Sequence, residues 1–329
     1  MRVTDEDLEL INALQIAPRA PWSVLGSVLR RNPSALAARW QRLKEAGVAW
    51  VIAYPKNVGG RGATALIALT SVPGRRQELL DWLLPLPLVA SIEDSGGTHD
   101  LNLTVLTLDY TQLATEVLAP LRASQLIAHL NTSLVTAERA TGGVWRLDAL
   151  TSAQERELTR MTPAPSHRRK EDPAGLPALL EALGEDGRAD VNHLAEVMGV
   201  HPSTAGRRLR QAVDEEAITF RCDMAQYDSG YPVMCQWFAR VPPEDHDRVH
   251  AFLRRYRTLR LLLSVTGEAN LVFTIWLRHP GEILQLELDL LAAVPTVRLL
   301  RTDSGLAMYK RMGRLLSPNS RAKFSYLGG

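Results

Sequence analysis

Apolar residues recur at helical spacing in three short stretches of the first fifty residues. The stretches cover residues 5–16, the region around 24–29, and a segment that begins at Pro33 and ends before Gly47. Their apolar positions are Leu8, Ile11, Leu14, Val24, Leu25, Val28, Leu29, Leu36, Trp40 and Leu43. Three short helices joined by tight turns are the plan of a helix-turn-helix. The pattern therefore predicts a helix-turn-helix domain over residues 1–50.

The periodicity changes after residue 62. Residues 101–105 alternate apolar and polar side chains, as a half-buried strand does, whereas residues 75–84 and 110–121 keep helical spacing. Strands are also predicted at 64–70, 89–93 and 127–135. The order β-α-β-β-α-β predicts a ferredoxin-like domain over residues 62–140. Residues 51–61 are predicted to be a hinge strand followed by a glycine-rich loop, ahead of the ferredoxin-like domain.

The second half of the chain repeats both patterns. Ser203 lies 169 positions after Ser34, and Gly267 lies 170 positions after Gly97, in two unrelated motifs. A shared offset indicates an internal duplication. The predicted fold class is α+β, with two winged or helix-turn-helix modules and two ferredoxin-like βαββαβ modules. Its further parts are a linker at 141–175, a second helix-turn-helix at 176–220, a second ferredoxin-like domain at 221–312 and a C-terminal tail at 313–329.

Composition narrows the class of protein. A formal net charge of +2 over 329 residues does not indicate a globally basic nucleic-acid binder, so any basic signal must be local. Two cysteines without metal-ligand spacing fit a reduced, intracellular protein. The acidic start MRVTDEDLEL does not resemble a signal peptide, and no apolar run is long enough for a membrane helix. We therefore expect a cytoplasmic protein that does not contact a membrane.

The third helix of each half carries candidate DNA contacts. From Arg30 to Lys44 there are five basic residues and no acidic one. A recognition helix places cations on phosphates and small or polar residues near base edges. The alternative is a solvated arginine face on an ordinary helical bundle. The predicted DNA-binding residues are Asn32, Ser34, Ala35, Arg39 and Arg42 in the first half, and His201, Ser203, Thr204, Arg207, Arg208 and Arg210 in the second.

A glycine-rich loop precedes the third strand of each predicted sheet. Glycine could serve there only to allow a positive φ in a hairpin. The functional interpretation is a small-ligand pocket lined by exposed backbone N–H groups. The predicted effector-binding residues are Gly96, Gly97, Thr98 and Asp100 in the first loop, and Gly267, Glu268 and Asn270 in the second. His99, His193, His201 and His279 show no ligand-like clustering in the sequence, so we expect them to be ordinary polar residues and not metal ligands. No phosphate loop, nucleophile elbow or carboxylate pair is present, so neither catalysis nor a cofactor or metal is expected.

The sequence resembles the Lrp/AsnC (feast/famine) family of transcriptional regulators. The resemblance is carried by Asp7, Leu14-Gln15, Arg19, the stretch from Ser34 to Val48, and the glycine loops. It covers most of residues 1–140 and 176–312. In that family a helix-turn-helix is joined by a short strand to a ferredoxin-like domain that dimerises and binds amino acids. The duplication within one chain and Asn270, where the family usually has Asp, depart from the pattern.

The resemblance implies a sequence-specific regulator that binds double-stranded DNA and responds to a small metabolite, most plausibly an amino acid. Residues 62–140 and 231–312 are expected to pair within the chain as a pseudo-dimer, which could assemble into a higher homo-oligomer. Asp100 could hold the ammonium group of an amino acid, whereas the neutral Asn270 could not supply that charge.

Two alternatives belong to other classes of protein. Siroheme decarboxylases share this fold, sometimes as fused copies, and are similar to a pattern with His or Tyr before Asn-Leu-Trp-Phe on the third strand. Here that strand reads Asp100-Leu101-Asn102-Leu103 or Asn270-Leu271-Val272-Phe273, without the Trp. The other alternative is an effector-sensing protein that does not bind DNA.

Overall fold

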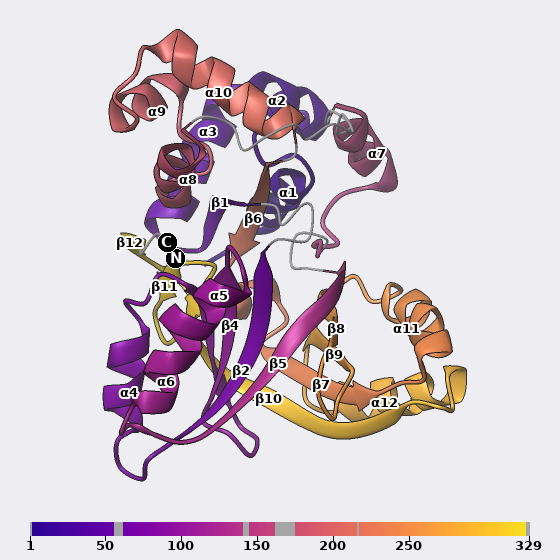
Figure 1. Ribbon diagram of the computed structural model, residues 1–329. Coiled ribbons are helices and arrows are strands. Elements are labelled where there is room, and N and C mark those ends of the chain that lie inside the picture. The colour runs from indigo at the N-terminus through magenta and orange to yellow at the C-terminus, as the bar shows by residue number, and fades with distance from the viewer. Residues whose placement is uncertain (1, 56–61, 141–144, 162–174, 216, 327–329) are drawn as a thin grey trace. The chain divides into compact units, whose positions relative to one another are not determined.

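The chain divides into two compact units that alternate along the sequence (Figure 1). The computed structural model describes residues 2–55, 62–140, 145–161, 175–215 and 217–326. Unit 1 combines the described parts of 1–61, 146–225 and 321–329, and unit 2 those of 62–145 and 226–320. The predicted glycine-rich loop, up to residue 61, and the proline-rich stretch 162–173 lie outside the described residues.

Unit 1 begins with the three helices that the periodicity predicts. They are α1 (Asp5–Ile16), α2 (Trp22–Leu29) and α3 (Pro33–Glu45), followed by β1 (Ala49–Pro55). Thr4 and Asp7 form a capping box at the start of α1. The Asn32 side chain caps α3, and Gly47, with a φ of 67°, ends it. The apolar stripes of the helices are buried against one another, which is why these weakly helical segments form.

A second set of helices in unit 1 repeats this order. It comprises α8 (Leu176–Glu185), α9 (Val191–Val197), α10 (Pro202–Asp214) and the strand β6 (Ile218–Met224). Strand β6 pairs antiparallel with β1 over seven residues. Arg19 and Arg188 connect the two sets reciprocally: Arg19 donates to the carbonyl of Ala189 at 2.9 Å, and Arg188 donates to that of Ala20 at 2.9 Å. Each half of unit 1 therefore satisfies backbone carbonyls of the other.

Two segments for which no helix or strand was predicted contain regular elements. The region 141–175, expected to be a linker, contains α7 (Ser152–Met161), whose Leu158 is fully buried and which contacts α1 and α2. In the C-terminal tail 313–329, fraying was expected only from Ser317 onward; β11 (Arg314–Leu316) lies before that point, and β12 (Ala322–Tyr326) lies within the part expected to fray. All three elements are short or polar, so their formation depends on tertiary contacts rather than on local periodicity.

The first half of unit 2 has the predicted order of strands and helices. Its elements are β2 (Ala63–Ser71), α4 (Arg76–Leu83), β3 (Val89–Ser95), β4 (Leu101–Thr107), α5 (Tyr110–Gln112), a π-helical turn (Leu113–Leu118), α6 (Ala119–Ala123) and β5 (Ile127–Ala140). The strands pair in the order β3-β4-β2-β5. Apolar side chains on one sheet face form a core with the helices.

The second half of unit 2 follows the same order. Its elements are β7 (Val233–Arg240), α11 (His246–Leu253), β8 (Leu259–Val265), β9 (Leu271–Leu277), α12 (Glu282–Ala293) and β10 (Arg298–Arg311), with short 3₁₀ turns at Gln226–Ser229 and Pro243–Asp245. The strands pair in the order β8-β9-β7-β10. This half has its own helix-covered core. Mixed helix and sheet of this kind make the chain an α+β protein.

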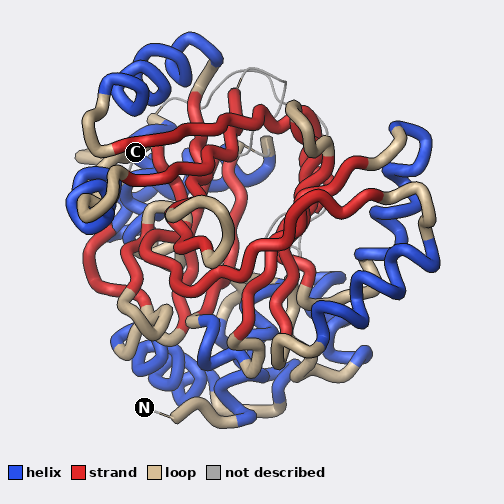
Figure 2. The backbone as a smooth tube through the Cα atoms, turned by 90° about the horizontal axis from the view of Figure 1, so that it is seen from below, coloured by secondary structure: helices blue, strands red, loops and turns tan. Residues whose placement is uncertain are grey.

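The two halves of unit 2 share strand pairings (Figure 2, strands in red). Strand β5 pairs with β8, with Val135 opposite Val265, and β10 pairs with β3, with Gly305 opposite Ser95. Strands β5 and β10 each run for 14 residues, longer than the predicted segments, because their second parts pair with the other half. Residues as far apart in the sequence as Ser95 and Gly305 are thereby paired. In the part of the chain that the structure describes, no helix has the length and apolar character needed to cross a membrane.

Candidate functional site

In the first predicted recognition helix, α3, the side chain of Arg39 is paired with acidic residues of α1. The Arg39 guanidinium donates to the Asp7 carboxylate at 2.7 Å and also to that of Glu6. Arg31 forms a second ion pair with Glu6, at 2.6 Å. Burial raises the pKa of Asp7, but hydrogen bonds from Thr4 and Arg39 outweigh it and hold that pKa below the ordinary value. Arg39 is therefore only 22% exposed and already has anionic partners.

The remaining predicted residues of α3 lie at its first turn or beside a hollow. Asn32 is the cap: its side-chain oxygen accepts from the backbone N–H groups of Ser34 at 2.9 Å and Ala35 at 3.3 Å. Arg42 lines a shallow hollow of about 490 Å³ together with Thr4, the acids of the first turn of α1, and Arg39. Arg2 also lines this hollow, so its three acids and three arginines balance in formal charge, and it is not a net basic site for a phosphate.

The second predicted recognition helix, α10, is more open. His201 caps it by accepting from the Ser203 N–H at 3.3 Å, and Thr204 follows in the first turn. Arg207 and Arg210 are exposed, whereas Arg208 is half-buried. Within the described residues, none of these three arginines forms an ion pair. Among the described residues, both helices thus present exposed arginines without an ion pair, Arg207 and Arg210 on α10 and Arg42 on α3, but Arg39 of α3 is already paired with acids of α1.

The glycine loops use their Asp and Asn side chains to hold the strands together. The Asp100 carboxylate accepts from the Ser71 N–H at 2.7 Å and from its hydroxyl at 2.6 Å. At the equivalent place, Asn270 accepts from the Val241 N–H at 2.8 Å and donates to the carbonyl of Val241 at 2.7 Å. One oxygen of Asp100 is therefore committed to the fold rather than to the ammonium group of an effector.

The glycines of the two loops serve different purposes. Gly267 has a φ of 115°, a conformation that favours glycine. Gly96 and Gly97 instead allow a close approach of β10: the Gly96 N–H donates to the Ser304 carbonyl at 2.9 Å, and a Cβ on Gly97 would lie 2.2 Å from the Asp303 carboxylate. The loop before β4 is thus shaped around an acidic side chain of the other half of unit 2.

His99, in the same loop, lies at the centre of a polar cluster that sequence reasoning missed. Its Nδ1 is 3.3 Å from Nη1 of Arg301 and 3.1 Å from the Thr98 hydroxyl. The His129 ring, on β5, lies 6.3 Å from the His99 ring. The only sequence signal was the position of His99 directly before the third strand, because Arg301 is 202 residues away and its proximity depends on the β10–β3 pairing.

Arg301 is held from two sides. Its Nε lies 3.1 Å from the Asp303 carboxylate, and its guanidinium stacks 3.8 Å from the centre of the Phe238 ring. Asp303 is only 2% exposed, and the Ser95 hydroxyl donates to it at 3.4 Å. The other Asp303 oxygen is buried without a hydrogen-bond donor among the described residues. A buried carboxylate thus fixes the cation that contacts the imidazole.

This environment fixes the protonation state of His99. Burial lowers the pKa of His99, and the Arg301 guanidinium lowers it further, while Asp303 acts in the opposite direction. Arginine can only donate hydrogen bonds, so Nδ1 must accept and the proton of the neutral ring lies on Nε2. Without a ligand, His99 is therefore a neutral imidazole that presents an N–H group.

The corresponding loop before β9 lacks this chemistry. Ala269 precedes Asn270 where His99 precedes Asp100. The loop is instead tied by Arg240, which donates to the backbone carbonyls of Gly267 at 3.1 Å and Glu268 at 3.3 Å.

The structure places both cysteines in the interior. Burial raises the pKa of the Cys222 thiol above its usual range and that of Cys235 to about 12. Neither is positioned as a nucleophile. Among the described residues, no group of three His, Cys, Asp or Glu side chains could hold a metal ion.

Comparison with known proteins finds similarity in structure. No family model matches the sequence, and no curated protein matches it. The siroheme decarboxylase NirDL superposes with a TM-score of 0.54 at 13% identity, covering 95% of this chain and 96% of that one. Its complex with an iron-uroporphyrin III analogue gives 0.51 at 13% identity, with coverages of 89% and 88%. The leucine response regulatory protein of Mycobacterium tuberculosis gives 0.35 at 20% identity and covers 40% of this chain and 89% of that one.

These findings correct one expectation. The prediction that the chain is not an enzyme is wrong, because a structure that it matches from end to end is that of an enzyme. The Lrp/AsnC regulator matches only part of the chain. The missing Trp on the third strand had counted against the decarboxylase alternative, but a fold is maintained by its pattern of burial and tolerates such a change.

Proposed function

We propose that this protein is a decarboxylase that removes a carboxylate substituent from an iron tetrapyrrole. Siroheme, which the name of the structurally similar enzyme gives as its substrate, belongs to this class. The observation that carries the proposal is the contact between His99 and Arg301, 3.3 Å apart and backed by the buried Asp303. It places a cation that binds carboxylates beside a titratable proton donor.

Together with this function we propose an internally duplicated arrangement of modules. We infer that α1–α3 and α8–α10 are two helix-turn-helix modules, and that the βαββαβ segments of unit 2 are two ferredoxin-like modules, produced by a tandem duplication. The equivalent element orders, the strand orders β3-β4-β2-β5 and β8-β9-β7-β10, and the reciprocal Arg19 and Arg188 contacts support this interpretation.

Decarboxylation needs a held carboxylate and a delivered proton. The bond between the carboxylate and its carbon breaks, carbon dioxide leaves, and the electron pair that remains on carbon takes up a proton. Arg301 can bind the substrate carboxylate with two parallel N–H groups. His99 can supply the proton and then regain one from solvent.

Substrate binding itself would prepare this proton donor. In the free protein, Arg301 donates to Nδ1 of His99 and disfavours a second proton on the ring. When the guanidinium turns to the substrate carboxylate, Nδ1 becomes available, and the neighbouring anion raises the pKa of His99. We therefore expect the imidazolium to form when the substrate is bound.

A spectroscopic titration tests the proposal. Siroheme added to the protein should shift its visible absorption on binding, and mass spectrometry of the extracted pigment should show the loss of carbon dioxide. Arg301→Ala should weaken binding, whereas His99→Ala should still bind the pigment but convert it much more slowly. The absence of any spectral change with wild-type protein at concentrations well above micromolar would refute the assignment.

DNA binding is a second candidate, and the observation that favours it is the open basic face of α10. Arg207 and Arg210 are exposed and can reach phosphates, while Ser203 and Thr204 lie at the first turn. An amino-acid effector at the glycine loops would belong to this function.

The test of this candidate is binding to the DNA upstream of its own coding sequence. Arg207→Ala with Arg210→Ala should lower the salt dependence of binding by about one unit per lost phosphate contact. The matched change of Arg39 in α3 to Ala should have little effect, because Arg39 is already paired with Glu6 and Asp7. Equal effects of both changes would contradict a contact made through α10.

A further inference from the structure

Helix α12 carries leucines on its solvent side. Leu284, Leu288 and Leu291 follow one another at spacings of four and three residues, and they are 64%, 54% and 37% exposed. This spacing places them on one stripe of the helix, while Leu286 and Leu290 on the opposite side fill the core. Single exposed leucines are common on protein surfaces, but a contiguous stripe marks an interaction surface.

The corresponding helical segment in the first half of unit 2 has no such stripe. From Tyr110 to Ala123 the large apolar side chain that is exposed is Tyr110, and the other exposed residues are Thr111, Ala114, Thr115, Glu116, Ala119, Pro120, Arg122 and Ala123. Both segments lie between the third and fourth strands of their half and cover a sheet. Because the sheet needs only one apolar helix face, the outward leucines of α12 are not required by the fold of this half.

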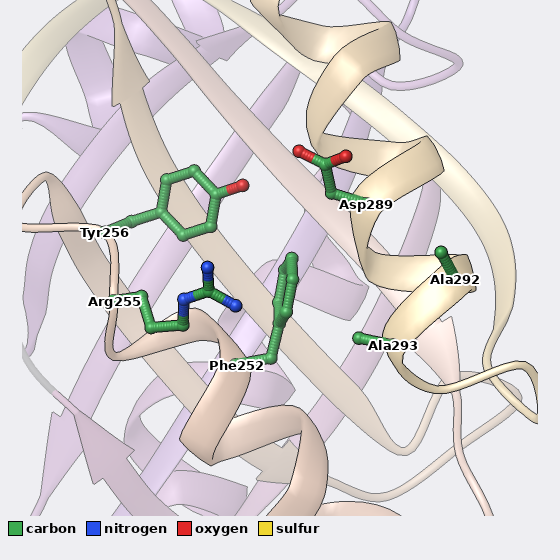
Figure 3. Close-up of a pocket in the computed structure, with 6 residues that line it drawn as sticks. All are labelled: Phe252, Arg255, Tyr256, Asp289, Ala292 and Ala293. Carbon is green, nitrogen blue, oxygen red and sulfur yellow. The ribbon is translucent and has the colours of Figure 1, made fainter.

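A groove with opposite charges lies beside the stripe, between the end of α11 and α12 (Figure 3). It has a volume of about 630 Å³ and is lined by Phe252, Arg255, Tyr256, Asp289, Ala292 and Ala293. Arg255 lies on the α11 side of the groove, and Asp289 lies on α12 (Figure 3). Ala292 and Ala293 are small enough to let another helix approach closely.

We propose that this surface is where a second copy of the chain docks, with α12 of one copy antiparallel to α12 of the other. A two-fold contact repeats every interaction, so a surface that carries an acid and a base side by side can form two symmetric ion pairs. Asp289 of each copy would face Arg255 of the other. Leu288 would lie near the axis, with Leu284 of one helix beside Leu291 of the other.

Sedimentation of the full chain over a range of concentrations tests this dimer. Wild type should sediment as a dimer, and Leu288→Arg should weaken dimerisation about 30-fold or more, since it places a charge at the centre of an apolar contact. Leu306→Arg is the matched control: Leu306 is a 60% exposed leucine on β10 of the same unit, and its change should leave the dimer intact.

A charge exchange identifies the orientation of the two copies. Arg255→Glu and Asp289→Arg should each weaken the dimer, and the double variant should restore it, because the pair is then reversed on both sides. All variants should keep the circular dichroism of wild type, since these side chains are on the surface. A wild type that remains monomeric, or a dimer that tolerates Leu288→Arg, would overturn the proposal, and another partner would then have to cover the stripe.

Discussion

The two glycine loops of unit 2 have the same structural role but different chemistry. Asp100 and Asn270 each tie their loop to the end of the neighbouring first strand of that half, at Ser71 and Val241. Only the first loop adds an imidazole, His99, with Arg301 and a buried carboxylate behind it. The second loop has Ala269 and a backbone clamp from Arg240. Equivalent positions thus retain the hydrogen bonds that hold the fold together, while only one of the two loops carries an imidazole paired with an arginine.

The largest expected effect concerns the residues that the loops do not share. His99→Ala should lower the rate of decarboxylation by about 10² to 10⁴, the usual contribution of a positioned acid. His279→Ala, at an exposed histidine after β9, is the control and should leave the rate unchanged. The rate is measured by single-turnover conversion of siroheme.

The second glycine loop can be given the imidazole that it lacks by the change Ala269→His. Ala269→His should not create a second active loop, because the position on β5 that is equivalent to Arg301 holds Asn131 and not an arginine. A doubled rate in this variant would show that the arginine is dispensable.

The next effect is on stability and comes from Gly97. Gly97→Ala should cost about 1–3 kcal/mol in the free energy of unfolding, because the new Cβ would meet the buried Asp303 carboxylate. Urea unfolding measures this cost. It should shrink in the background of Asp303→Ala, which removes the obstructing group.

Gly267→Ala is the contrasting change. Its Cβ would make only ordinary contacts, with the Ser133 hydroxyl oxygen at 3.6 Å, so its cost of about 1 kcal/mol should come from the positive φ and should be unaffected by Asp303→Ala. Equal responses of both glycine variants to the loss of Asp303 would contradict the contact described for Gly97.

A third effect distinguishes Asp100 from Asn270, the two residues whose side chains hydrogen-bond each loop to the neighbouring strand. Asp100→Asn should cost less than about 1 kcal/mol, since an amide oxygen can still accept from Ser71. Asn270→Asp should cost about 1–3 kcal/mol more, because a carboxylate would face the Val241 carbonyl that Asn270 now donates to. Thermal or urea unfolding of both variants gives the difference, and a reversed order would show that the assigned hydrogen bonds are wrong.

The smallest effect is a shift in the titration of His99. Since the pKa of His99 is lowered in the folded protein, its contribution to stability is complete above the unfolded value of about 6.5 and is lost as the pH falls through the folded value. Asp303→Asn should lower that pKa further, because the Asp303 charge now raises it. NMR titration of the ring protons measures this directly, and an unchanged or raised pKa would contradict the arrangement.

The local elements were largely determined by the sequence. Helical spacing at Leu36, Trp40 and Leu43, and alternation from Leu101 to Val105, predicted helices and strands that the structure contains. Such patterns are local because each depends on which residues of one segment are buried together. The equivalent order of elements in both halves could be predicted for the same reason, as could the end of α3 at Gly47, whereas Asn32, assigned to DNA, proved to be the cap of that helix.

The tertiary structure alone decided what the candidate residues do. Sequence spacing assigned Arg39 to DNA and Asp100 to an effector, but the fold places the acids of α1 on Arg39 and Ser71 on Asp100. It also brings Arg301 to His99, which no local pattern indicates. The physical reason is that a charged side chain takes whichever partner the packing presents, and here that partner depends on strand register and helix packing between segments up to 202 residues apart.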